Sequence, residues 1–424
     1  MNDESFFDQL ERLGVGKGPQ HLRSQKRSSG PAIETLLAGE VVDSDQGSYF
    51  LYQEAYDLAY RHGYHVLSDL LVQDLAGPAL LARDERLVGI DVRQMAFVDT
   101  ETTGLAGGTG TYAFLVGVGV FQESDFVVHQ FFMRDFDEEP AQLHALGALF
   151  DQLEAVVSFN GKSFDMPLLE TRFVMARQMP RLLEAPHLDL LPAARRFWKY
   201  RLDSCALSSL ERKVLGVGRA EEDVPGWMIP SLYDRYVRSG DAREMPGIFY
   251  HNAQDILSLV TLTARMCALL APTSEADGET PGEDLYGLAR LYQDLGWHDR
   301  AETAYAQASQ SARSPEVREM AKRDLAFLLK RQERRAEALS WWQDLVEVEG
   351  AIYACEELAK HYEWHEVDLA QAQAWTQQAI GLVEAWPRSY KRREVLKELL
   401  HRHDRLQRKL AVQMSSPGSK TESP

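Results

Sequence analysis

Apolar and polar residues form short, changing patterns along the first two thirds of the chain. From Met95 onward, three apolar runs separated by turn residues predict strands, namely MAFVD, FLVGVGVF and FVVHQFFM. Further along, a buried strand is expected at 156–160. Helices are expected over 138–153 and 165–178, in two stretches of 188–216, and from before Asp255 to about Leu270. Strands followed by strand–helix alternation predict a layered α/β domain.

The last third of the chain is predicted to be entirely helical and to repeat. Alanines and aromatic residues recur at the spacings of a tetratricopeptide helix–turn–helix unit, in which alanines let paired helices approach and tyrosines fill the gap. The three copies comprise Leu288, Ala289, Tyr292, Gly296, Ala301, Tyr305 and Ala308; Leu325, Ala326, Leu329, Ala338, Trp342 and Leu345; and Leu358, Ala359, Tyr362, Ala372, Trp375 and Ala379. Three copies suffice for a stacked core, so a tetratricopeptide-like solenoid is favoured over three unrelated helical hairpins.

Shifts in composition predict where the domains begin and end. Residues 1–30 include the segment GVGKGPQHLRSQKRSSG, which is rich in Gly, Ser and basic residues. An acidic segment with Gly and Pro separates the two regions described above. The expected order is a disordered segment (1–30), an extension packed on the next domain (31–90), the α/β domain (91–272), a linker (273–284), helical repeats (285–412) and a disordered tail (413–424).

The amino-acid composition is typical of a soluble globular protein without a cysteine-ligated metal site. The 424 residues are 45% apolar and 26% charged, as in a soluble globular protein. The three cysteines are far apart and form no Cys-x-x-Cys, which argues against a zinc ribbon or a cysteine-ligated cluster. Residues 1–20 lack a signal-peptide core and no apolar run is expected to span a membrane, so a cytoplasmic location is expected.

Charge excludes one class of nucleic-acid-binding protein. With 46 basic and 64 acidic residues, the net charge is −18. A protein that coats nucleic acid nonspecifically needs a basic surface, so a histone-like role is excluded. A nuclease remains compatible, because carboxylates that hold metal ions add to the negative count.

Candidate chemistry begins with an acid pair in the segment FVDTETTGL. Asp99 and Glu101 are two residues apart on a predicted strand, so both side chains leave the same face. Neighbouring carboxylates repel each other unless a cation lies between them, and Mg²⁺ and Mn²⁺ prefer carboxylate oxygens. Taken alone, the pair is equally explained by a strand that ends at Val98 with both acids solvated.

Two further acids strengthen the interpretation. Asp165 follows the strand VVSFN and a turn, and Asp255 lies on the polar side of an amphipathic helix. Each taken alone is explained by a helix cap or a surface position. The order of D-x-E, N-x-x-x-x-D and a histidine four residues before an aspartate resembles the three motifs of the DEDD 3′–5′ exonuclease superfamily, which has a ribonuclease-H-like fold.

The resemblance is closer to the bacterial YprB family, which joins a ribonuclease-H-like domain, a mixed sheet flanked by helices, to a C-terminal tetratricopeptide-like region. It covers about residues 32–270 strongly and the helical region more weakly. The segments that carry it are DTETTGLAGGTGTYAFLVGVG (99–119), SFNGKSFDMPLLETRF (158–173), HLDLLPAARRFWKYRLDSCALSSLE (187–211), DVPGWMIPSLY (223–233) and HNAQDILSL (251–259).

This resemblance implies a two-metal 3′–5′ exonuclease. Two divalent ions, Mg²⁺ or Mn²⁺, would be held by the four acids: Asp99 would bridge both, Glu101 and Asp255 would bind mainly one, and Asp165 would bind the second. Two ions about 4 Å apart activate water and stabilise the leaving oxygen. The reaction would hydrolyse DNA or RNA from a 3′ end, expected to be single-stranded, and release nucleoside monophosphates.

Several neighbouring residues are candidates for binding the substrate. The resemblance implies that Thr102, Thr103 and Gly104 place backbone N–H groups near the terminal sugar and phosphate; an ordinary polar turn is the alternative. Asn160 and Lys162 precede Asp165 in a loop, and a lysine beside a metal cluster suits a phosphate. A solvated loop lysine explains Lys162 equally well.

Other patterns have simpler explanations. Gly108 to Ala113 matches the letters of a dinucleotide-binding fingerprint, but a strand follows where that motif needs a helix, so a hairpin turn is expected. Basic residues interleave with Phe197, Trp198 and Tyr200, which suits either single-stranded nucleic acid or a helix core. Residues 388–409 hold nine Lys/Arg and three acids, a net of +6, which suits a nucleic-acid contact or, more commonly, a solvated helix.

The general base is predicted from helix geometry. The superfamily has a histidine five residues before its last aspartate or a tyrosine four before it, whereas here Tyr250 is five before Asp255 and His251 four before. Residues four apart share a helix face, so His251 is expected to face the metals. Imidazole also titrates near neutral pH and suits a base better than a phenol.

Two classes of function therefore remain. The first is the metal-dependent exonuclease with a helical-repeat arm for a protein partner, with no role for a membrane. The second is a non-catalytic nucleic-acid-binding or adaptor protein with a silent nuclease-like site, because helical solenoids usually bind peptides or proteins. Retention of all four acids favours the first.

Overall fold

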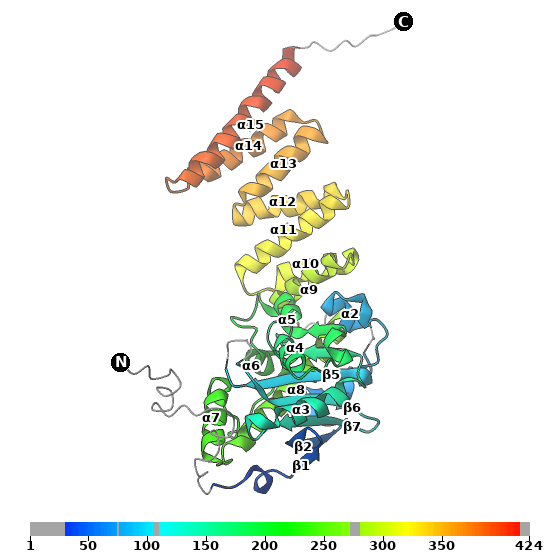
Figure 1. Ribbon diagram of the computed structural model, residues 1–424. Coiled ribbons are helices and arrows are strands. Elements are labelled where there is room, and N and C mark those ends of the chain that lie inside the picture. Colours follow the sequence, from blue (N-terminus) through cyan, green and yellow to red (C-terminus); the bar gives the residue numbers. More distant parts are fainter. Residues whose placement is uncertain (1–29, 74–75, 105–109, 272–279, 416–424) are drawn as a thin grey trace, which may run out of the picture. The chain divides into compact units, whose positions relative to one another are not determined.

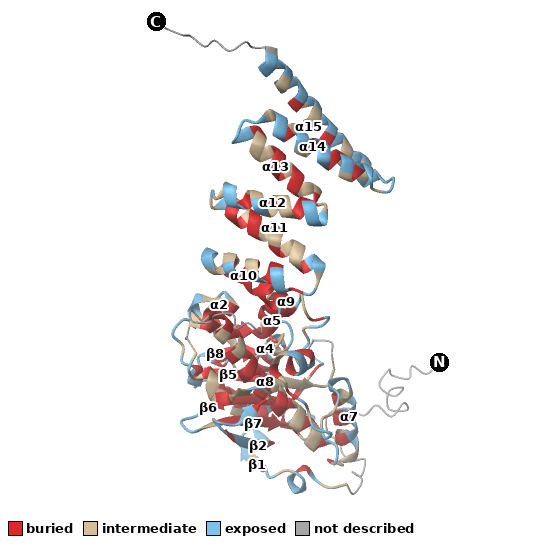
Figure 2. Cartoon of the chain, turned by 180° about the vertical axis from the view of Figure 1, so that it is seen from behind, coloured by how far each residue is buried: buried red, intermediate tan, exposed pale blue. Residues whose placement is uncertain are grey.

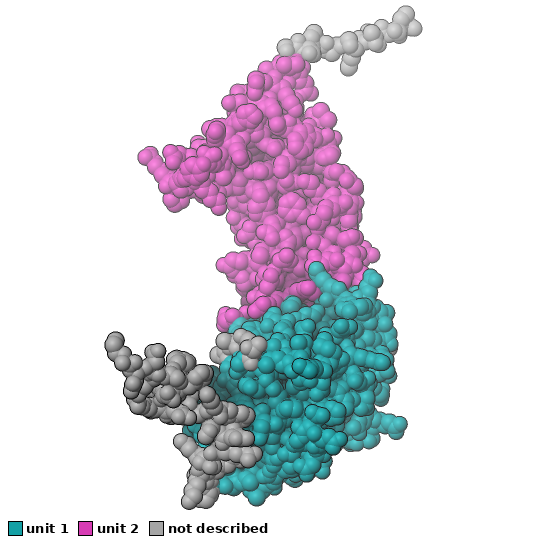
Figure 3. Space-filling view, viewed as in Figure 1, with its two compact units in different colours: residues 1–194, 204–274 teal, residues 195–203, 275–424 magenta. Residues whose placement is uncertain are grey.

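A computed structural model describes residues 30–73, 76–104, 110–271 and 280–415. The chain divides into two compact units, coloured separately in Figure 3: residues 1–194 with 204–274, and residues 195–203 with 275–424. The expected α/β fold with a mixed sheet in the first region and the expected all-helical fold of the C-terminal region are both confirmed. The expected disorder of residues 1–29 and 416–424 and the position of Gly108 lie outside the described residues.

A seven-stranded mixed sheet forms the centre of the first unit. Its spatial order is β1-β2-β7-β6-β5-β8-β9. The pairs from β1 to β5 are antiparallel, and the pairs β5–β8 and β8–β9 are parallel. The strands are β1 (Glu40–Ser44), β2 (Gly47–Asp57), β5 (Met95–Thr102), β6 (Ala113–Phe121), β7 (Asp125–Phe132), β8 (Ala155–Ser158) and β9 (His187–Asp189), with a separate hairpin of β3 (Arg61–His62) and β4 (His65–Val66).

The central strands are apolar because helices cover both faces of the sheet. Every residue of β6 and β8 is buried, as a strand between two layers requires. One face packs against α3 and α4, and the other packs against α7 and α8 (Figure 1). The helices of this region are α2 (Ala76–Ala82), α3 (Glu139–Phe150), α4 (Asp165–Met175), α5 (Leu190–Trp198), α6 (Leu207–Leu210), α7 (Ile229–Ser239) and α8 (Met245–Leu270).

Short helical turns connect these elements. They are η2 (Ile33–Thr35), η3 (Leu67–Leu70), η4 (Glu85–Leu87), η5 (Val92–Gln94), η6 (Phe136–Glu138), η7 (Arg181–Glu184), η8 (Glu211–Leu215) and η9 (Gly226–Met228). The turn η8 has π-helical hydrogen bonding and directly continues α6. It ends at Gly216, whose φ of +69° is favourable for glycine.

Residues 31–90 contribute to the sheet as well as packing on it. Strand β2 pairs with β7 along eight residues, from Phe50 opposite Phe132 to Asp57 opposite Asp125. Strand β1 then forms the edge beyond β2. The sequence pattern did not separate these strands from an extension, because their burial is irregular and much of β2 is exposed.

Helix α8 passes through the core of the first unit. By length and composition it could cross a membrane, which differs from the expectation that no apolar run is long enough. However, 83% of its most apolar window is buried inside the protein, where it packs on the sheet. Its apolar character is therefore explained by the core, since a helix covered on all sides is apolar all round.

The second unit consists of helices that contact one another in chain order. The pairs α9–α10, α11–α12 and α13–α14 form successive hairpins, and α15 packs on α14 (Figure 1). Small and aromatic positions predicted from the repeat, such as Ala289, Tyr305 and Ala326, are fully buried. The helices are α9 (Gly282–Asp294), α10 (His298–Ser311), α11 (Pro315–Arg331), α12 (Arg335–Glu349), α13 (Ile352–Trp364), α14 (Leu369–Glu384) and α15 (Tyr390–Ser415).

Two ends of this helical region differ from the sequence interpretation. Residues 282–284, expected in the linker, begin α9, where Glu283 accepts hydrogen bonds from the backbone N–H groups of Arg313 and Ser314 at 2.7 and 2.9 Å. Residues 413–415, expected in a disordered tail, complete α15. In both cases the helix continues through residues whose composition suggested a loop.

Residues 195–203 belong to the second unit although the chain around them belongs to the first. Phe197 and Trp198 are almost fully buried, so the hypothesis that they stack on nucleic acid is wrong. Arg201 forms an ion pair with Asp284 of α9 at 2.7 Å, and Tyr200 packs edge-on against Tyr286. This short segment is thus held by α9, the first helix of the C-terminal helical region.

The backbone of α9 lies very close to that of residues 195–203, and this contact can be tested by substitution. A Cβ on Gly287 would overlap the carbonyl oxygen of Phe197, whereas one on Gly381, in α14, would meet no atom within 4 Å. We expect Gly287→Ala to lower the free energy of unfolding by about 1–3 kcal/mol because backbone must move. The matched change Gly381→Ala should raise it by about 0.5–1 kcal/mol through helix propensity.

The measurement is denaturant unfolding of the full-length protein and both variants by circular dichroism. If Gly287→Ala proved as harmless as Gly381→Ala, then α9 would not hold residues 195–203 as closely as described.

Candidate active site

The acid pair on β5 faces helix α8. Asp99 lies opposite Gly117 of β6, and a Cβ on Gly117 would overlap the Asn252 side chain of α8. The missing side chain therefore lets α8 approach the sheet closely. Asn252 Nδ2 donates to Asp99 Oδ2 at 2.8 Å, and Gln130 Nε2 donates to Asn252 Oδ1 at 2.8 Å. This chain of hydrogen bonds orients the Asp99 carboxylate.

Helix α8 brings a histidine and a third acid to the same face. His251 Nε2 lies 4.0 Å from Glu101 Oε1 and 3.9 Å from Asp255 Oδ2. The two α8 residues are one helical turn apart, so their side chains leave the same side of the helix. Their side chains and that of Glu101 are only 12–17% exposed, which places the group in a largely buried setting.

The fourth acid comes from the opposite layer of the domain. Asp165 is the first residue of α4, and its Oδ1 accepts a hydrogen bond from the hydroxyl of Thr100. Thr100 lies between the two acids of β5 and therefore points to the other face of the sheet. Gly161 is buried beside the Asp165 carboxylate, where a Cβ would overlap Ser158. The end of β5 thus brings together acids from both sides of the sheet.

The acids perturb one another electrostatically. Burial raises the pKa of Asp99 well above its usual range, and the nearby charges of Asp255, Glu101 and Asp165 raise it further. The pKa of Glu101 is raised by burial and then by Asp255 and Asp165. Burial also raises the pKa of Asp165 to about 6. Such mutual destabilisation of the charged forms marks a place where a cation would be stabilising.

The guanidinium of Arg219 already lies beside the buried acids of the site. Arg219, in the loop after η8, donates to Asp255 and contacts both oxygens of Glu211, at 2.6 Å from Nη2 and 2.9 Å from Nε. Glu211 is almost fully buried. Burial raises the pKa of Asp255, and the charge of Arg219 opposes that rise. Arg219 therefore partly neutralises two buried carboxylates.

The His251 ring is held from behind by two charged neighbours. Its Nδ1 lies 2.8 Å from Asp223 Oδ1 and 3.0 Å from Arg219 Nη1. Asp223 accepts a hydrogen bond when Nδ1 carries the proton, and Arg219 donates one when it does not. The Tyr250 hydroxyl instead accepts the backbone N–H of Ala220 at 3.1 Å. Within α8, His251 faces the acids and Tyr250 does not.

The donor set fits a divalent cation. Four carboxylates offer the hard oxygen ligands that Mg²⁺ and Mn²⁺ prefer, in a setting that disfavours uncompensated negative charge. In the described part of the chain, no three His, Cys, Asp or Glu side chains form a ready-made metal cluster. One carboxylate oxygen of each of Asp99, Asp165 and Asp255 accepts a hydrogen bond from a protein donor instead, so a metal ion would compete with these donors.

The predicted substrate-binding residues at the end of β5 form hydrogen bonds with neighbouring residues of the protein. The Thr102 hydroxyl donates to the Gly104 carbonyl at 2.9 Å. The Thr103 N–H donates to the Tyr112 carbonyl, and the Thr103 hydroxyl accepts the Tyr112 N–H, both at 3.0 Å. Thr103 therefore closes the hairpin between β5 and β6, and its N–H already has a partner.

The predicted loop residues before Asp165 are held by an acid that the sequence did not single out. The backbone N–H groups of Asn160 and Lys162 donate to the two oxygens of Asp189, at 2.8 and 3.2 Å. Asn160 has a φ of +66°, a left-handed conformation that asparagine tolerates. The Lys162 side chain is exposed. Asp189 thus shapes the loop, while the lysine stays available.

Sequence reasoning missed the residues that support the acids: Asn252, Asp223, Arg219, Glu211 and Asp189. Asn252 adjoins His251 in the motif HNAQD and could have been found there. Arg219 and Asp223 lie in the segment VGRAEEDVPG, whose charges are typical of a solvated loop.

Comparison with known proteins identifies the family of the chain and the class of its first domain. Residues 96–267 match the model of the RNase_H superfamily, a span that contains all four acids and His251. An uncharacterised protein, YprB of Bacillus subtilis (strain 168), is 32% identical over 343 residues, which cover 79% of this chain and 81% of the relative. The chain belongs to the YprB family. Its first unit is accordingly a ribonuclease-H-like domain.

The ion pairs of Arg219 lead to a prediction for this YprB-family protein. We expect Arg219→Gln to lower the free energy of unfolding in EDTA by about 3–5 kcal/mol, because Asp255 and Glu211 lose their cation. Mn²⁺ should then raise the melting temperature of the variant more than that of the wild type, because it replaces the lost charge. Thermal melting with EDTA and with Mn²⁺ measures both effects.

Arg219→Lys is the matched control, because it keeps the positive charge and should retain much of the stability. An Arg219→Gln variant as stable as wild type in EDTA would show that the arginine does not balance the acids.

Proposed function

We propose that this YprB-family protein is a metal-dependent 3′–5′ exonuclease that acts on single-stranded nucleic acid. The observation that carries the proposal is the convergence of four carboxylates and His251, from β5, α4 and α8, at one end of the sheet. A ribonuclease-H-like domain supports nuclease chemistry in general. We further propose that the protein acts in the cytoplasm, which its few cysteines are consistent with.

The residues have complementary roles in this proposal. Asp99, Glu101, Asp165 and Asp255 would hold Mg²⁺ or Mn²⁺, which when bound supplies a nucleophilic water and charge stabilisation. His251 accepts the water's proton at Nε2. Asp223 would favour the tautomer with the proton on Nδ1, which would leave Nε2 free to act as the base, provided that Arg219 does not donate to Nδ1. Lys162 meets a phosphate of the substrate.

Two exposed aromatic side chains support a single-stranded substrate. Phe164 precedes Asp165 directly and is 57% exposed. Trp227 is 78% exposed and follows Gly226, where an added Cβ would lie 3.7 Å from His251 Nε2. Unpaired bases stack on such rings, whereas a duplex keeps its bases inside. The proposed helical-repeat arm, tetratricopeptide-like in pattern, would bind a protein partner.

A non-catalytic adaptor is the second candidate, and one observation favours it. Arg219 donates to Asp255, so a positive charge of the chain itself occupies part of the acid group. In a silent site this arginine would permanently replace a metal ion. In an active site it would leave Asp255 when metal binds.

The deciding experiment is degradation of 3′-labelled single-stranded DNA and RNA by the full-length protein with Mg²⁺ or Mn²⁺. We expect release of nucleoside monophosphates, with Asp165→Ala slower by about 10²-fold or more because a metal ligand is lost. EDTA should abolish the reaction. Equal inertness of the wild type and Asp165→Ala on both substrates would overturn the exonuclease proposal.

A second prediction concerns the base. His251→Ala should lower turnover by about 10²-fold or more, with stabilisation by Mn²⁺ retained, because the proton acceptor is lost and the carboxylates stay. Tyr250→Phe should keep turnover near wild type, because the Tyr250 hydroxyl only accepts a backbone hydrogen bond. Single-turnover rates and melting temperatures measure the two properties separately. The opposite ranking of the two variants would assign the base to Tyr250.

A further inference from the structure

We propose that the start of helix α15 is a second binding surface for single-stranded nucleic acid, separate from the carboxylate site. The surface, which we call the α15 patch, comprises Arg388, Tyr390, Lys391, Arg392, Arg393 and Lys397. This inference goes beyond the proposed exonuclease and does not depend on whether the carboxylate site cleaves.

The α15 patch is exposed and concave. Arg388, Lys391, Arg393 and Lys397 are exposed, as is much of α15 in Figure 2, and the Tyr390 ring is 71% exposed. A hollow of about 520 Å³ is lined by Arg388, Ser389, Tyr390, Arg392, Arg393 and Leu396. The guanidinium of Arg393 lies 6.0 Å from the centre of the Tyr390 ring. Cations and an aromatic face thus border one hollow.

The basic residues of 388–409 form a single run in the sequence, but in the structure they fall into two groups that differ in their ion pairs. Near the end of α15, Arg402, Arg405 and Lys409 surround the fully buried carboxylate of Glu363, at 3.7, 2.6 and 2.7 Å. Those three cations hold α15 against α13. Within the described ranges, the cations of the α15 patch form no ion pair, and the buried Nε of Arg392 has no hydrogen-bond partner. Their charge is therefore available to a ligand.

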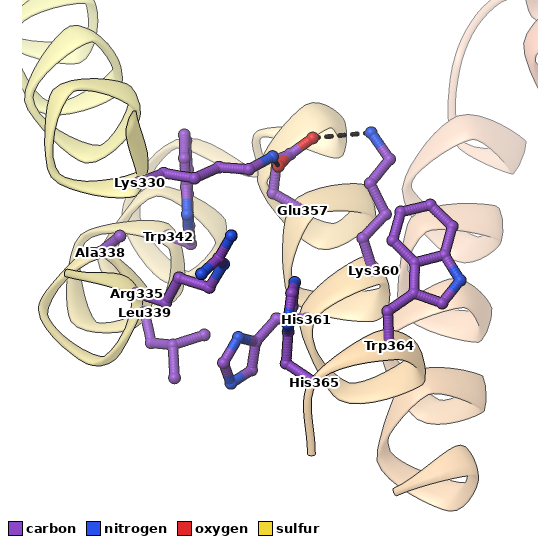
Figure 4. Close-up of a pocket in the computed structure, with 10 residues that line it drawn as sticks. All are labelled: Lys330, Arg335, Ala338, Leu339, Trp342, Glu357, Lys360, His361, Trp364 and His365. Atoms are coloured by element: carbon purple, nitrogen blue, oxygen red, sulfur yellow. Dashed lines mark hydrogen bonds and ion pairs between the residues drawn. The ribbon is translucent and has the colours of Figure 1, made fainter. Parts of the chain in front are cut away.

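A second site in the same unit also combines basic and aromatic residues, but its cations are paired with acids. A cavity of about 180 Å³ between α11, α12 and α13 is lined by Lys330, Arg335, Ala338, Leu339, Trp342, Glu357, Lys360, His361, Trp364 and His365 (Figure 4). There Glu357 binds both Lys330 and Lys360, and Arg335 binds Glu333. The cations of this cavity are already neutralised, whereas those of the α15 patch are not.

The chemistry of the α15 patch favours a nucleic-acid strand over an acidic protein. Clustered arginines neutralise successive phosphates, and an exposed tyrosine beside them can stack on a base. Trp386 adds a second ring, 5.9 Å from the Lys391 ammonium. An acidic peptide would use the cations but has no need of the Tyr390 face. The loss of one ring therefore distinguishes the two ligands.

The test measures binding of the full-length protein in EDTA, where no cleavage occurs, to a fluorescent single-stranded 30-mer of DNA or RNA. Arg388→Gln/Arg392→Gln/Arg393→Gln should weaken binding about tenfold or more and reduce the slope of log K against log salt by about 2, as three phosphate contacts imply. Tyr390→Ala should weaken binding about fivefold or more.

The matched control is Arg313→Gln/Arg331→Gln/Arg408→Gln, which removes three exposed cations elsewhere on the same unit. It changes the net charge equally and should leave affinity within about twofold, because phosphate contacts are local. Equal losses for both triple variants, or no loss for the patch variant, would overturn the proposal. Tight binding of polyglutamate that Tyr390→Ala leaves intact, with no binding of either 30-mer, would assign the patch to an acidic protein.

Binding in EDTA also separates this proposal from the exonuclease. A protein that binds through the α15 patch but never cleaves with Mg²⁺ or Mn²⁺ would support the patch and reject the nuclease. A protein that cleaves with metal, but binds equally well when the α15 patch is substituted, would support the nuclease and reject the patch.

Discussion

The arrangement of the site depends on how closely helix α8 approaches the sheet. Gly117 and Gly119 of β6 have no side chain beneath α8, and a Cβ on either would overlap Ile256 of that helix. The close approach brings Asn252 within hydrogen-bond distance of Asp99 and His251 within about 4 Å of Glu101. Protein interiors are packed densely, so filling either gap would push the helix and its candidate site residues away together.

This packing has an electrostatic cost that the chain offsets locally. Bringing four acids into one largely buried place raises the pKa of each. Arg219 reduces that cost by binding Asp255 and Glu211. The same ion pair bears on both candidate functions, because an arginine that turns away makes room for a metal ion, whereas one that stays makes a silent site. Whether Arg219 or a metal ion binds Asp255 therefore distinguishes the two candidate functions.

Much of the site could be predicted because its motifs are local. A D-x-E pair on a strand places Asp99 and Glu101 on one face by the period of the strand alone. The four-residue spacing of His251 and Asp255 places both on one side of α8 by the period of the helix. Arg219 and Asp223 lacked such a signal, because a charged residue in a loop has the same sequence pattern whether it is solvated or bonded to a distant partner. Asp189 ends the short strand β9, and the sequence does not show that it bonds to the loop before Asp165.

By itself, the sequence determined the order of strands and helices from β5 to β8, the all-helical C-terminal region and a set of candidate site residues, since these follow from local periodicity and from motif spacing. Only the tertiary structure decided that β1 and β2 complete the sheet and that residues 195–203 join the C-terminal helical unit. It also decided that some cations of α15 bind Glu363, while those of the α15 patch form no ion pair with the described residues. The physical reason is that burial and ion pairing join residues far apart in the chain, and the identity of a residue does not specify which partner it meets.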